Sequence, residues 1–457
     1  MNAPSLPLTR LLLALAIPLA FAACKPQPQT TGDASPPPAT TAEPPPAQPP
    51  DAIKPATGTI DATEENVAAT RQHLSEAAKA ARDKWRGKTF EEFEASVFKE
   101  PGENGKYIVN GDIAIPDRKL LQEFFEAIQE DIDGTAHGKL VLNLVNGVDD
   151  VWTSAKKRHL TYCISSAFGA RKQQVATDMD AATGAWEQAA NVDFVHLPAE
   201  DANCTANNQN VVFDVRPVDV DGEYLARAFF PNDQRSERNV LIDETSFGLE
   251  PGEKLQLVGI LRHELGHTLG WRHEHTRPEA GACFEDDEFK PITSYDRFSV
   301  MHYPQCNGGG DWSLILTGLD KAGAACIYGK GSSNTEDLGQ CVFRVPDAPA
   351  GGTETTGTID GQSVAKGEKK HYGPYAVKPG SIVEVKMTGV GGNAGDPDLY
   401  VRYVGKPDTT HWICRPYLSH ANETCELEVP TNRSQVFVMV RGYAAGSYKL
   451  EIRYTKP

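Results

Sequence analysis

The chain has few positive charges for its length. Its 457 residues carry 45 lysines and arginines against 62 aspartates and glutamates, which gives a formal net charge of −17. No lysine- and arginine-rich run with interleaved aromatic residues offsets this balance locally. Because a negatively charged surface repels a phosphate backbone, the composition argues against a nucleic-acid partner.

The N-terminal apolar run is too short for a confident membrane-spanning helix. The run LLLALAIPLAFAA, residues 11–23, is interrupted by Pro18, and a spanning helix needs roughly 20 apolar residues. Arg10 precedes the run and small residues end it, which predicts a secretory signal peptide over residues 1–23. We therefore expect the chain to be exported from the cytoplasm.

The end of this segment leaves two interpretations open. FAAC, residues 21–24, resembles the bacterial lipobox, although Phe21 stands where leucine is commonest. Lipidation of Cys24 would give an outer-membrane lipoprotein, whereas cleavage near Ala23 would give a secreted protein. Membrane attachment is expected only through such a lipid.

Cysteines are few, and their number is informative. Apart from Cys24 there are eight, an even number that in an exported chain predicts disulfides, although eight cysteines allow 105 pairings. We expect neighbours along the chain to pair: Cys163–Cys204, Cys283–Cys306, Cys326–Cys341 and Cys414–Cys425.

Composition divides the chain into segments. Residues 24–57 are rich in Pro, Ala and Thr and predict an extended linker. Residues 58–150, with helical patterns at 65–85 and 118–132, precede any catalytic-looking motif and are expected to be a pro-region. Residues 151–346 contain β-rich runs at 159–165, 192–198, 210–218 and 239–247, and an amphipathic helix is expected at 172–190 with Val175, Met179, Ala182 and Trp186 on its apolar face. Residues 347–457 contain glycine-punctuated strands typical of a β-sandwich. The expected class is α+β followed by an all-β domain.

A histidine cluster interrupts this pattern at HELGHTLGWRHEH, residues 263–275. His263 and His267 lie one turn apart on a predicted helix, so both imidazoles can reach a single ion. Gly270 allows a sharp turn that can bring His273 to the same ion. Three imidazoles with an open fourth position predict a catalytic zinc site. Glu264 can take a proton from the water that the zinc activates, which makes it the expected general base.

The motif is more specific than its first part. HExxH alone also occurs by chance on solvated helix faces. The full spacing HExxHxxGxxH, followed by a methionine in the turn SVMHYP at residues 299–304, is much less often accidental.

At these residues the chain resembles the metzincin zinc peptidases, and within them most the astacin family, through HEHTR at 273–277 and VMHY at 300–303. The resemblance implies a twisted mixed sheet with two long helices and zinc in the cleft. It also implies that Tyr303 is an additional zinc ligand able to stabilise an oxyanion, that Met301 forms an apolar floor under the metal, and that Glu274 pairs with the N-terminus of the mature enzyme. His275, His302 and Arg277 receive no catalytic role and are expected to be structural or solvated.

Other segments extend or limit this resemblance. LARAFFP, residues 225–231, is similar to matrixins, but Arg227 stands where those enzymes place a histidine for a structural zinc, so we expect one zinc ion. YIVNGD, residues 107–112, resembles the FxGD element of astacin propeptides, in which the aspartate binds the zinc and keeps the enzyme latent. Asp112 would then be the latency switch, with activating cleavage between about residues 113 and 151. The other interpretation of Asn-Gly-Asp is an ordinary hairpin turn.

The last hundred residues resemble the bacterial pre-peptidase C-terminal domain through DPDLYVRY at 396–403 and VRGYAAGSYKLEIRY at 440–454. Asp396 and Asp398 suit either a calcium site or a simple turn. Calcium is therefore an open alternative without further support.

Taken together, the sequence predicts an exported zinc endopeptidase acting on a protein or peptide substrate. Two alternatives remain. The same zinc chemistry would hydrolyse another acyl substrate, such as an ester or a cell-wall peptide, because the substrate is chosen by a cleft that sequence does not show. A non-catalytic surface binding protein on this scaffold is disfavoured, since binding has no need for Glu264.

Overall fold

The computed structural model describes residues 85, 87–102, 105–129, 141–145, 148–249, 253–281, 283, 285, 289–310, 312–334, 352–391 and 394–457. The predicted signal peptide, Cys24, the linker and the helical pattern at 65–84 lie outside these residues. Among the residues described, no helix is both long enough and apolar enough to span a membrane.

The first described part is a small domain with its own apolar core. A three-stranded antiparallel sheet in the order β1-β2-β3 packs with two helices around Phe93, Tyr107, Leu121 and Phe125. α3 matches the predicted helical segment as far as Gln129. The elements are β1 Phe98–Lys99, β2 Tyr107–Val109, β3 Ile113–Ile115, α2 Phe90–Glu94 and α3 Arg118–Gln129. We call residues 85–129 the N-terminal domain.

A five-stranded mixed sheet forms the centre of the next part, in the order β7-β6-β8-β10-β9. The pairs β6–β7, β6–β8 and β8–β10 are parallel, and the edge strand β9 is antiparallel to β10. The predicted β-rich runs supply four of these strands. Their bounds are β6 Leu160–Ile164, β7 Phe194–His196, β8 Phe213–Val218, β9 Ala226–Arg227 and β10 Asn239–Asp243.

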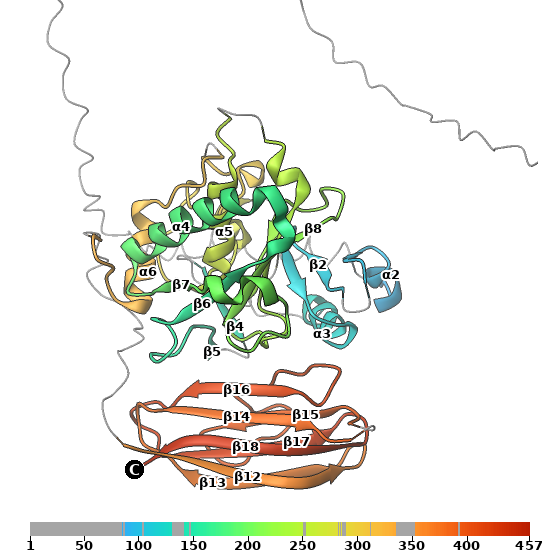
Figure 1. Cartoon of the computed structure of the whole chain (residues 1–457). Helices are drawn as coiled ribbons and strands as arrows, with labels where there is room; N and C mark the ends of the chain where they lie inside the picture. The colour runs from blue at the N-terminus through green and yellow to red at the C-terminus, as the bar shows by residue number, and fades with distance from the viewer. Residues whose placement is uncertain are drawn as a thin grey trace, which may run out of the picture. The chain divides into compact units, whose positions relative to one another are not determined.

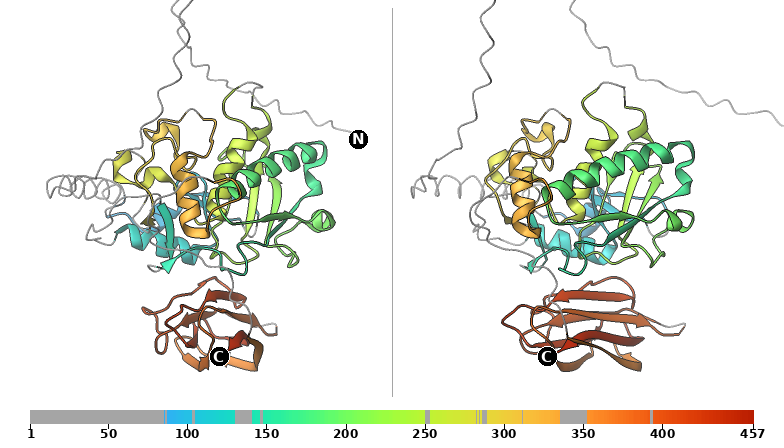
Figure 2. Two further views of the ribbon diagram at one scale, coloured as in Figure 1. Left: turned by 90° about the vertical axis from the view of Figure 1, so that its left-hand side faces the viewer. Right: turned by 60° about the vertical axis from the view of Figure 1, so that its left-hand side comes forward.

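Three helices accompany this sheet. α4 and α5 run next to each other over it, and α6 contacts α4 (Figures 1 and 2). The predicted apolar face of α4 is confirmed, because Val175, Met179, Ala182 and Trp186 are all buried. The indole Nε1 of Trp186 donates a hydrogen bond to the carbonyl of Arg262 at 2.8 Å, which ties α4 to α5. The helices are α4 Lys172–Ala189, α5 Leu257–Thr268 and α6 Gly318–Tyr328.

A second, smaller sheet in the order β11-β4-β5 lies beside the histidine motif. Its strands are β4 Val141–Val145, β5 Val148–Asp149 and β11 Phe289–Pro291. Single-turn and short 3₁₀ helices complete this part: η1 Ser166–Arg171, η2 Pro198–Asn203, η3 Glu244–Phe247, η4 Glu274–Thr276, η5 Pro278–Ala280 and η6 Pro304–Cys306.

The C-terminal residues form two antiparallel sheets that share one buried apolar cluster, as the strand pattern predicted. One sheet has the order β12-β18-β14-β16 and the other β13-β17-β15. The strands are β12 Thr353–Val364, β13 Lys369–Ala376, β14 Ile382–Gly389, β15 Pro397–Arg402, β16 Glu423–Glu428, β17 Gln435–Gly442 and β18 Gly446–Lys456.

Three of the four predicted disulfides are confirmed: Cys163–Cys204, Cys283–Cys306 and Cys414–Cys425. The fourth, Cys326–Cys341, involves Cys341, which lies outside the described residues.

Candidate metal centre

The helix α5 carries the first two histidines into the interior. Leu261 and Leu265 are fully buried in the central apolar cluster, which fixes the helix rotation. His263 and His267 are each at most 3 % exposed. Their ring centroids lie 4.9 Å apart, as the one-turn spacing predicted.

A glycine turn brings the third histidine back to the first two. Gly270 has φ +92°, and a Cβ atom there would lie 2.2 Å from the carbonyl oxygen of Asp150, so both conformation and space require glycine. The strand β4 holds the two sides of the turn, because Asn143 N–H donates to Gly270 O at 2.8 Å and Arg272 N–H donates to Val141 O at 2.9 Å. The predicted role of Gly270 in ending the helix is confirmed.

One ring nitrogen of each histidine has a partner that fixes the imidazole. The Nδ1 atoms of His263 and His267 lie 2.8 Å and 2.7 Å from the carbonyl oxygens of Val300 and Trp271. A carbonyl oxygen only accepts, so these Nδ1 atoms carry the proton. His273 Nδ1 lies 2.5 Å from the Glu285 carboxylate. This arrangement leaves the Nε2 lone pairs of His263 and His267 available to a metal.

The three Nε2 atoms converge on one point together with the Asp112 carboxylate. They lie 3.4, 3.8 and 3.1 Å from its oxygens for His263, His267 and His273, and all four ligand atoms fall within 4.8 Å of one another. Zinc bonds of about 2.0–2.1 Å in a tetrahedron place neighbouring ligand atoms ~3.3 Å apart. The Nε2 atoms are buried and none has a hydrogen-bond partner. This set of orphaned donors fits a zinc ion.

Glu264 lies next to these ligands, on the same helix. It is 2 % exposed, and its Oε2 atom is buried without a hydrogen-bond partner. Burial, reinforced by the Asp112 carboxylate, raises the pKa of Glu264 well above its ordinary value. Removing Asp112 would therefore lower this pKa toward the range of a working general base.

Tyr303 and Met301 occupy the other sides of the centre. The Tyr303 hydroxyl donates to Asp112 Oδ2 at 2.5 Å, and its ring stacks on His263 with centroids 5.3 Å apart. Burial and the nearby Asp112 carboxylate raise the pKa of Tyr303 well above its ordinary value. Met301 is fully buried, and a Cβ on Gly266 would lie 2.3 Å from its Sδ atom. The thioether thus packs directly against α5 at a position where only glycine leaves room.

Asp112 reaches the histidines from the tip of a hairpin. β2 and β3 are joined by three residues, with φ 54° at Asn110 and 98° at Gly111. A Cβ on Gly111 would approach the Tyr303 ring to 3.3 Å. The hairpin interpretation is therefore correct, and the same turn places Asp112 among the three histidines. The two alternatives left open by the sequence are compatible in one structure.

The remaining predicted residues of the motif are buried. Glu274 accepts from Arg277 Nη1 at 2.8 Å and from Asp296 N–H at 2.9 Å, while its Oε2 is buried without a partner. Burial raises the pKa of Glu274 to about 8. His275 Nδ1 accepts from Tyr303 N–H at 3.2 Å, and His302 Nε2 lies 2.8 Å from the Tyr295 hydroxyl. These contacts fit the structural alternative for His275, His302 and Arg277 rather than the solvated one.

Glu285 was missed in the sequence. Its carboxylate lies 2.5 Å from His273 Nδ1, 3.3 Å from His275 Nε2 and 3.1 Å from Arg272 Nη2. A carboxylate behind a metal-binding histidine orients the ring and raises its basicity. Glu285 lies twelve residues after His273 in an irregular loop. No local spacing signal indicates the contact.

The Arg227 guanidinium is bound by two side chains. Its guanidinium binds the Glu100 carboxylate in bidentate fashion, with Nε–Oε1 2.6 Å and Nη2–Oε2 2.9 Å, and Nη1 donates to Asn239 Oδ1 at 2.6 Å. The position that a structural zinc histidine takes in matrixins is therefore held by an ion pair. Glu100 carried no signal in the sequence.

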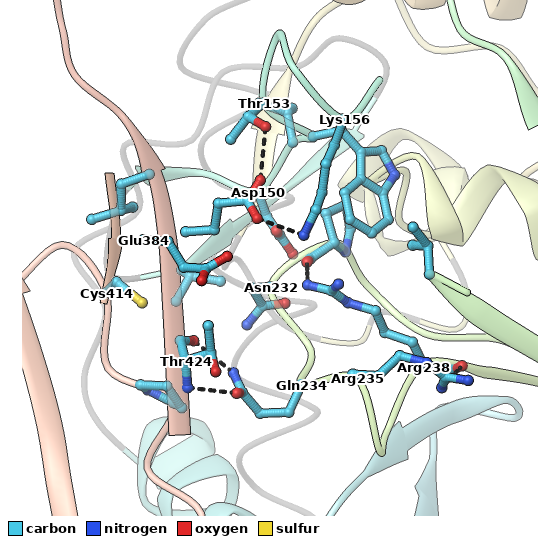
Figure 3. A pocket seen from close by; sticks show the side chains of 18 of the residues that line it. Asp150, Thr153, Lys156, Asn232, Gln234, Arg235, Arg238, Glu384, Cys414 and Thr424 are labelled. Carbon is cyan, nitrogen blue, oxygen red and sulfur yellow. Dashed lines mark hydrogen bonds and ion pairs between the residues drawn. The ribbon is translucent and has the colours of Figure 1, made fainter. Parts of the chain in front are cut away.

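Two other regions are separate from this centre. Among the described residues, the side-chain groups suited to a metal are Asp112 with the three histidines, and His273 with His275 and Glu285; neither includes Asp396 or Asp398. Figure 3 shows a pocket lined by residues from 145–238 and 384–427, among them Asp150 and Arg238. None of the histidines nor Glu264 lines it, so we do not assign it to the metal centre.

Comparison with known families agrees with this geometry. Residues 151–280 match the sequence model of the matrixin family, Peptidase_M10. This match supports a metallopeptidase domain of the metzincin type, with zinc as its metal.

Several bacterial proteases share shorter segments with the chain. A zinc metalloprotease of Helicobacter pylori is 36% identical over 86 residues, which is 19% of this chain and 32% of that protein. The hemagglutinin/proteinase of Vibrio cholerae is 36% identical over 86 residues, 19% of this chain and 13% of that protein. The alkaline serine exoprotease A of Vibrio alginolyticus is 35% identical over 111 residues, 24% of this chain and 20% of that protein. The chain thus spans a third or less of the length of these relatives, and their names include two catalytic classes. The shared segments alone do not decide the chemistry.

Proposed function

We propose that this protein is a zinc-dependent endopeptidase, most like the astacin family, that is exported and made as a latent precursor. The observation that carries the proposal is the convergence of three buried histidine Nε2 atoms, none with a hydrogen-bond partner, beside the buried Glu264. A zinc ion held by these histidines, as in metzincin peptidases, suits hydrolysis of a peptide bond. The export and anchoring steps rest on residues 1–24 of the sequence alone.

His263, His267 and His273 would hold the zinc ion, with Tyr303 as the additional ligand. Bound there, zinc supplies Lewis-acid activation of water and of the substrate carbonyl. Glu264 would accept the proton of the attacking water through Oε2, which has no hydrogen-bond partner, and return it to the leaving amine. The Tyr303 hydroxyl, freed from Asp112, donates to the oxyanion. Met301 keeps the underside of the centre dry and apolar.

The position of Asp112 supports the proposed latency. Its carboxylate lies among the three histidines, where water would otherwise bind, and it also accepts the Tyr303 hydroxyl. The same charge keeps the Glu264 pKa high. In the mature enzyme the orphaned Oε2 of Glu274 would accept the new N-terminus. The bounds predicted from the sequence are 58–150 for the pro-region and 151–346 for the peptidase domain; we count β4, Val141–Val145, with the peptidase domain, because its backbone hydrogen bonds hold the His273 turn. A domain of the pre-peptidase C-terminal type would follow at 347–457.

Glu264→Gln tests the general base. We expect the purified, activated variant to bind one zinc ion per chain but to lose at least ~100-fold in peptide turnover, because the neutral amide cannot take a proton. Zinc content is measured by elemental analysis and turnover with a fluorogenic peptide. Glu253→Gln, at an exposed position before the same helix, is the matched control. Turnover within tenfold of wild type would remove Glu264 as the base.

Asp112→Ala tests latency. We expect the uncut full-length variant to hydrolyse a small fluorogenic peptide, whereas the wild-type precursor remains silent, because the alanine leaves the fourth metal position and Tyr303 free. Glu126→Ala, on the exposed side of α3, should stay as silent as wild type. An Asp112→Ala precursor with one bound zinc and no gain in turnover would contradict aspartate latency.

A further inference from the structure

Residues 85–129 are the pro-domain under the proposed function, and we use that name here. Besides Asp112, this domain contacts the rest of the molecule through a second set of side chains. Glu100, directly after β1, and Lys106, directly before β2, face Arg227 and Glu237. We call these four residues the charge clamp. The pro-domain supplies the acid of one pair and the base of the other.

The pair of Arg227 and Glu100 is deeply buried and joined by two hydrogen bonds. Arg227 is 1 % exposed and holds both oxygens of Glu100. Tyr224 donates its hydroxyl to Glu100 Oε1 at 2.5 Å, and Asn239 Oδ1 accepts a third guanidinium hydrogen bond at 2.6 Å. Burial opposes ionisation of Glu100, but Arg227 outweighs it and holds the pKa of this carboxyl below its ordinary value. A bidentate, charge-assisted pair of this kind is a specific carboxylate site.

In the second pair, Lys106 and Glu237, the pro-domain supplies the positive charge. The Lys106 ammonium donates to the Glu237 carbonyl at 2.7 Å and lies 3.1 Å from its carboxylate. The backbone N–H of Lys106 also donates to Glu100 Oε2 at 3.2 Å, so the β1–β2 hairpin holds these two residues beside each other. Ile108 adds an apolar contact with Val220 and Tyr224.

None of the four clamp residues is a metal ligand, and the pro-domain has its own core. The pro-domain is therefore bound at two places, through Asp112 and through the charge clamp. Two contacts made by one folded domain give a much higher overall affinity than either contact alone. Withdrawing the pro-domain would also remove the carboxylate that Arg227 binds through two nitrogens.

We infer that Tyr224, Arg227, Glu237 and Asn239 form a binding site for the paired charges of the pro-domain, and that this site retains the pro-domain after the chain is cut. Cleavage between Gln129 and Val141 then leaves a two-chain, latent complex, and departure of the pro-domain is the activating step. The inference rests on the proposed function for its regulatory meaning, but the binding site itself does not need peptidase activity.

The test uses the chain from Lys25 to the C-terminus with a recognition sequence for a site-specific protease inserted between Gln129 and Val141. After cutting, retention of the N-terminal fragment is measured by size-exclusion chromatography with mass spectrometry, and peptide turnover is followed in parallel. We expect the wild-type fragment to co-elute with the remainder and turnover to stay low. With Glu100→Gln and Lys106→Met combined, the fragment should dissociate at least ~30-fold faster, and turnover should rise with its loss.

Three further variants keep the outcome interpretable. Glu91→Gln removes a carboxylate of the same domain that is 74% exposed and should behave as wild type. Asp112→Asn should stay bound after the cut, because the clamp is intact. Arg227→Gln combined with Glu100→Gln should release no faster than Arg227→Gln alone if the two residues act as a pair.

The inference is overturned if the wild-type fragment separates as soon as the chain is cut, or if the clamp variant is retained like wild type while each uncut variant unfolds at the wild-type temperature. A retained fragment in a complex whose isolated catalytic part shows no turnover would instead refute the proposed peptidase and leave the binding site standing.

Discussion

Replacing Glu285 should weaken zinc binding although this residue does not touch the metal position. Its carboxylate lies 2.5 Å from Nδ1 of His273, one of only three histidine ligands, and 3.1 Å from Arg272. Loss of such a partner typically costs ~10–100-fold in metal affinity, or about 1.4–2.8 kcal/mol. Glu285→Gln keeps a neutral oxygen acceptor, so we expect the lower end. Glu285→Ala leaves the buried imidazole N–H without an acceptor, so we expect the upper end.

The effect should grow with pH. Burial opposes protonation of His273, but Asp112 and Glu285 outweigh it and raise the pKa of His273 to about 10 in the metal-free chain. Below that pH, zinc competes with the bound proton, and removing Glu285 relieves part of the competition by lowering this pKa. The loss of ligand orientation therefore shows most clearly as the pH approaches 10.

The assay is competition for zinc between the full-length chain and a chelator, at several pH values, with thermal unfolding of the metal-free variants measured beside it. Glu279→Gln is the control, since Glu279 lies in the same loop region but has a side chain 32% exposed, with its carboxylate 3.4 Å from Arg277. Zinc affinity of Glu285→Ala within threefold of wild type across the pH range would refute the role of Glu285.

Two other predictions concern the same centre. Zinc binding to the full-length chain at pH 7.5 should release about one proton, because the His273 pKa of about 10 keeps that residue protonated until the metal arrives. Calorimetry in buffers of different ionisation enthalpy measures this, and a binding heat independent of buffer would contradict it. Gly266→Ala should destabilise by ~1–3 kcal/mol and lower the melting temperature by ~2–12 °C, because its Cβ would lie 2.3 Å from Met301 Sδ. Gly184→Ala on α4, with open space around its Cβ, should leave the melting temperature unchanged or raise it, and equal behaviour of the two variants would count against tight packing under the metal.

The sequence predicted the parts of the centre that depend on local geometry. His263 and His267 follow from helical period, and Gly270 from the need for a left-handed turn. α4 follows from the apolar spacing of residues such as Trp186. The three described disulfides agree with pairing between neighbours along the chain.

Contacts made by tertiary folding were not predictable in this way. Glu285 reaches His273 through an irregular loop, held by the disulfide between Cys283 and Cys306. Glu100 and Arg227 are 127 residues apart, and neither position shows a pattern that points to the other. The Asn-Gly-Asp turn had two interpretations because backbone conformation and side-chain destination are separate questions. The sequence predicts the backbone turn directly, but it predicts the contact of Asp112 with the histidines only through the resemblance to astacin propeptides.

The hydrogen bonds of β4 limit how short a working form of this protein can be. Val141 and Asn143 provide backbone partners on both sides of the turn that carries His273, although they precede the matrixin match at residue 151. Under the proposed function, a protease that trimmed the chain past Val141 would remove these partners and loosen the third ligand, so peptide turnover would be lost rather than gained. Two main-chain hydrogen bonds, rather than a cleavage motif, therefore set the latest N-terminus that still keeps His273 in position.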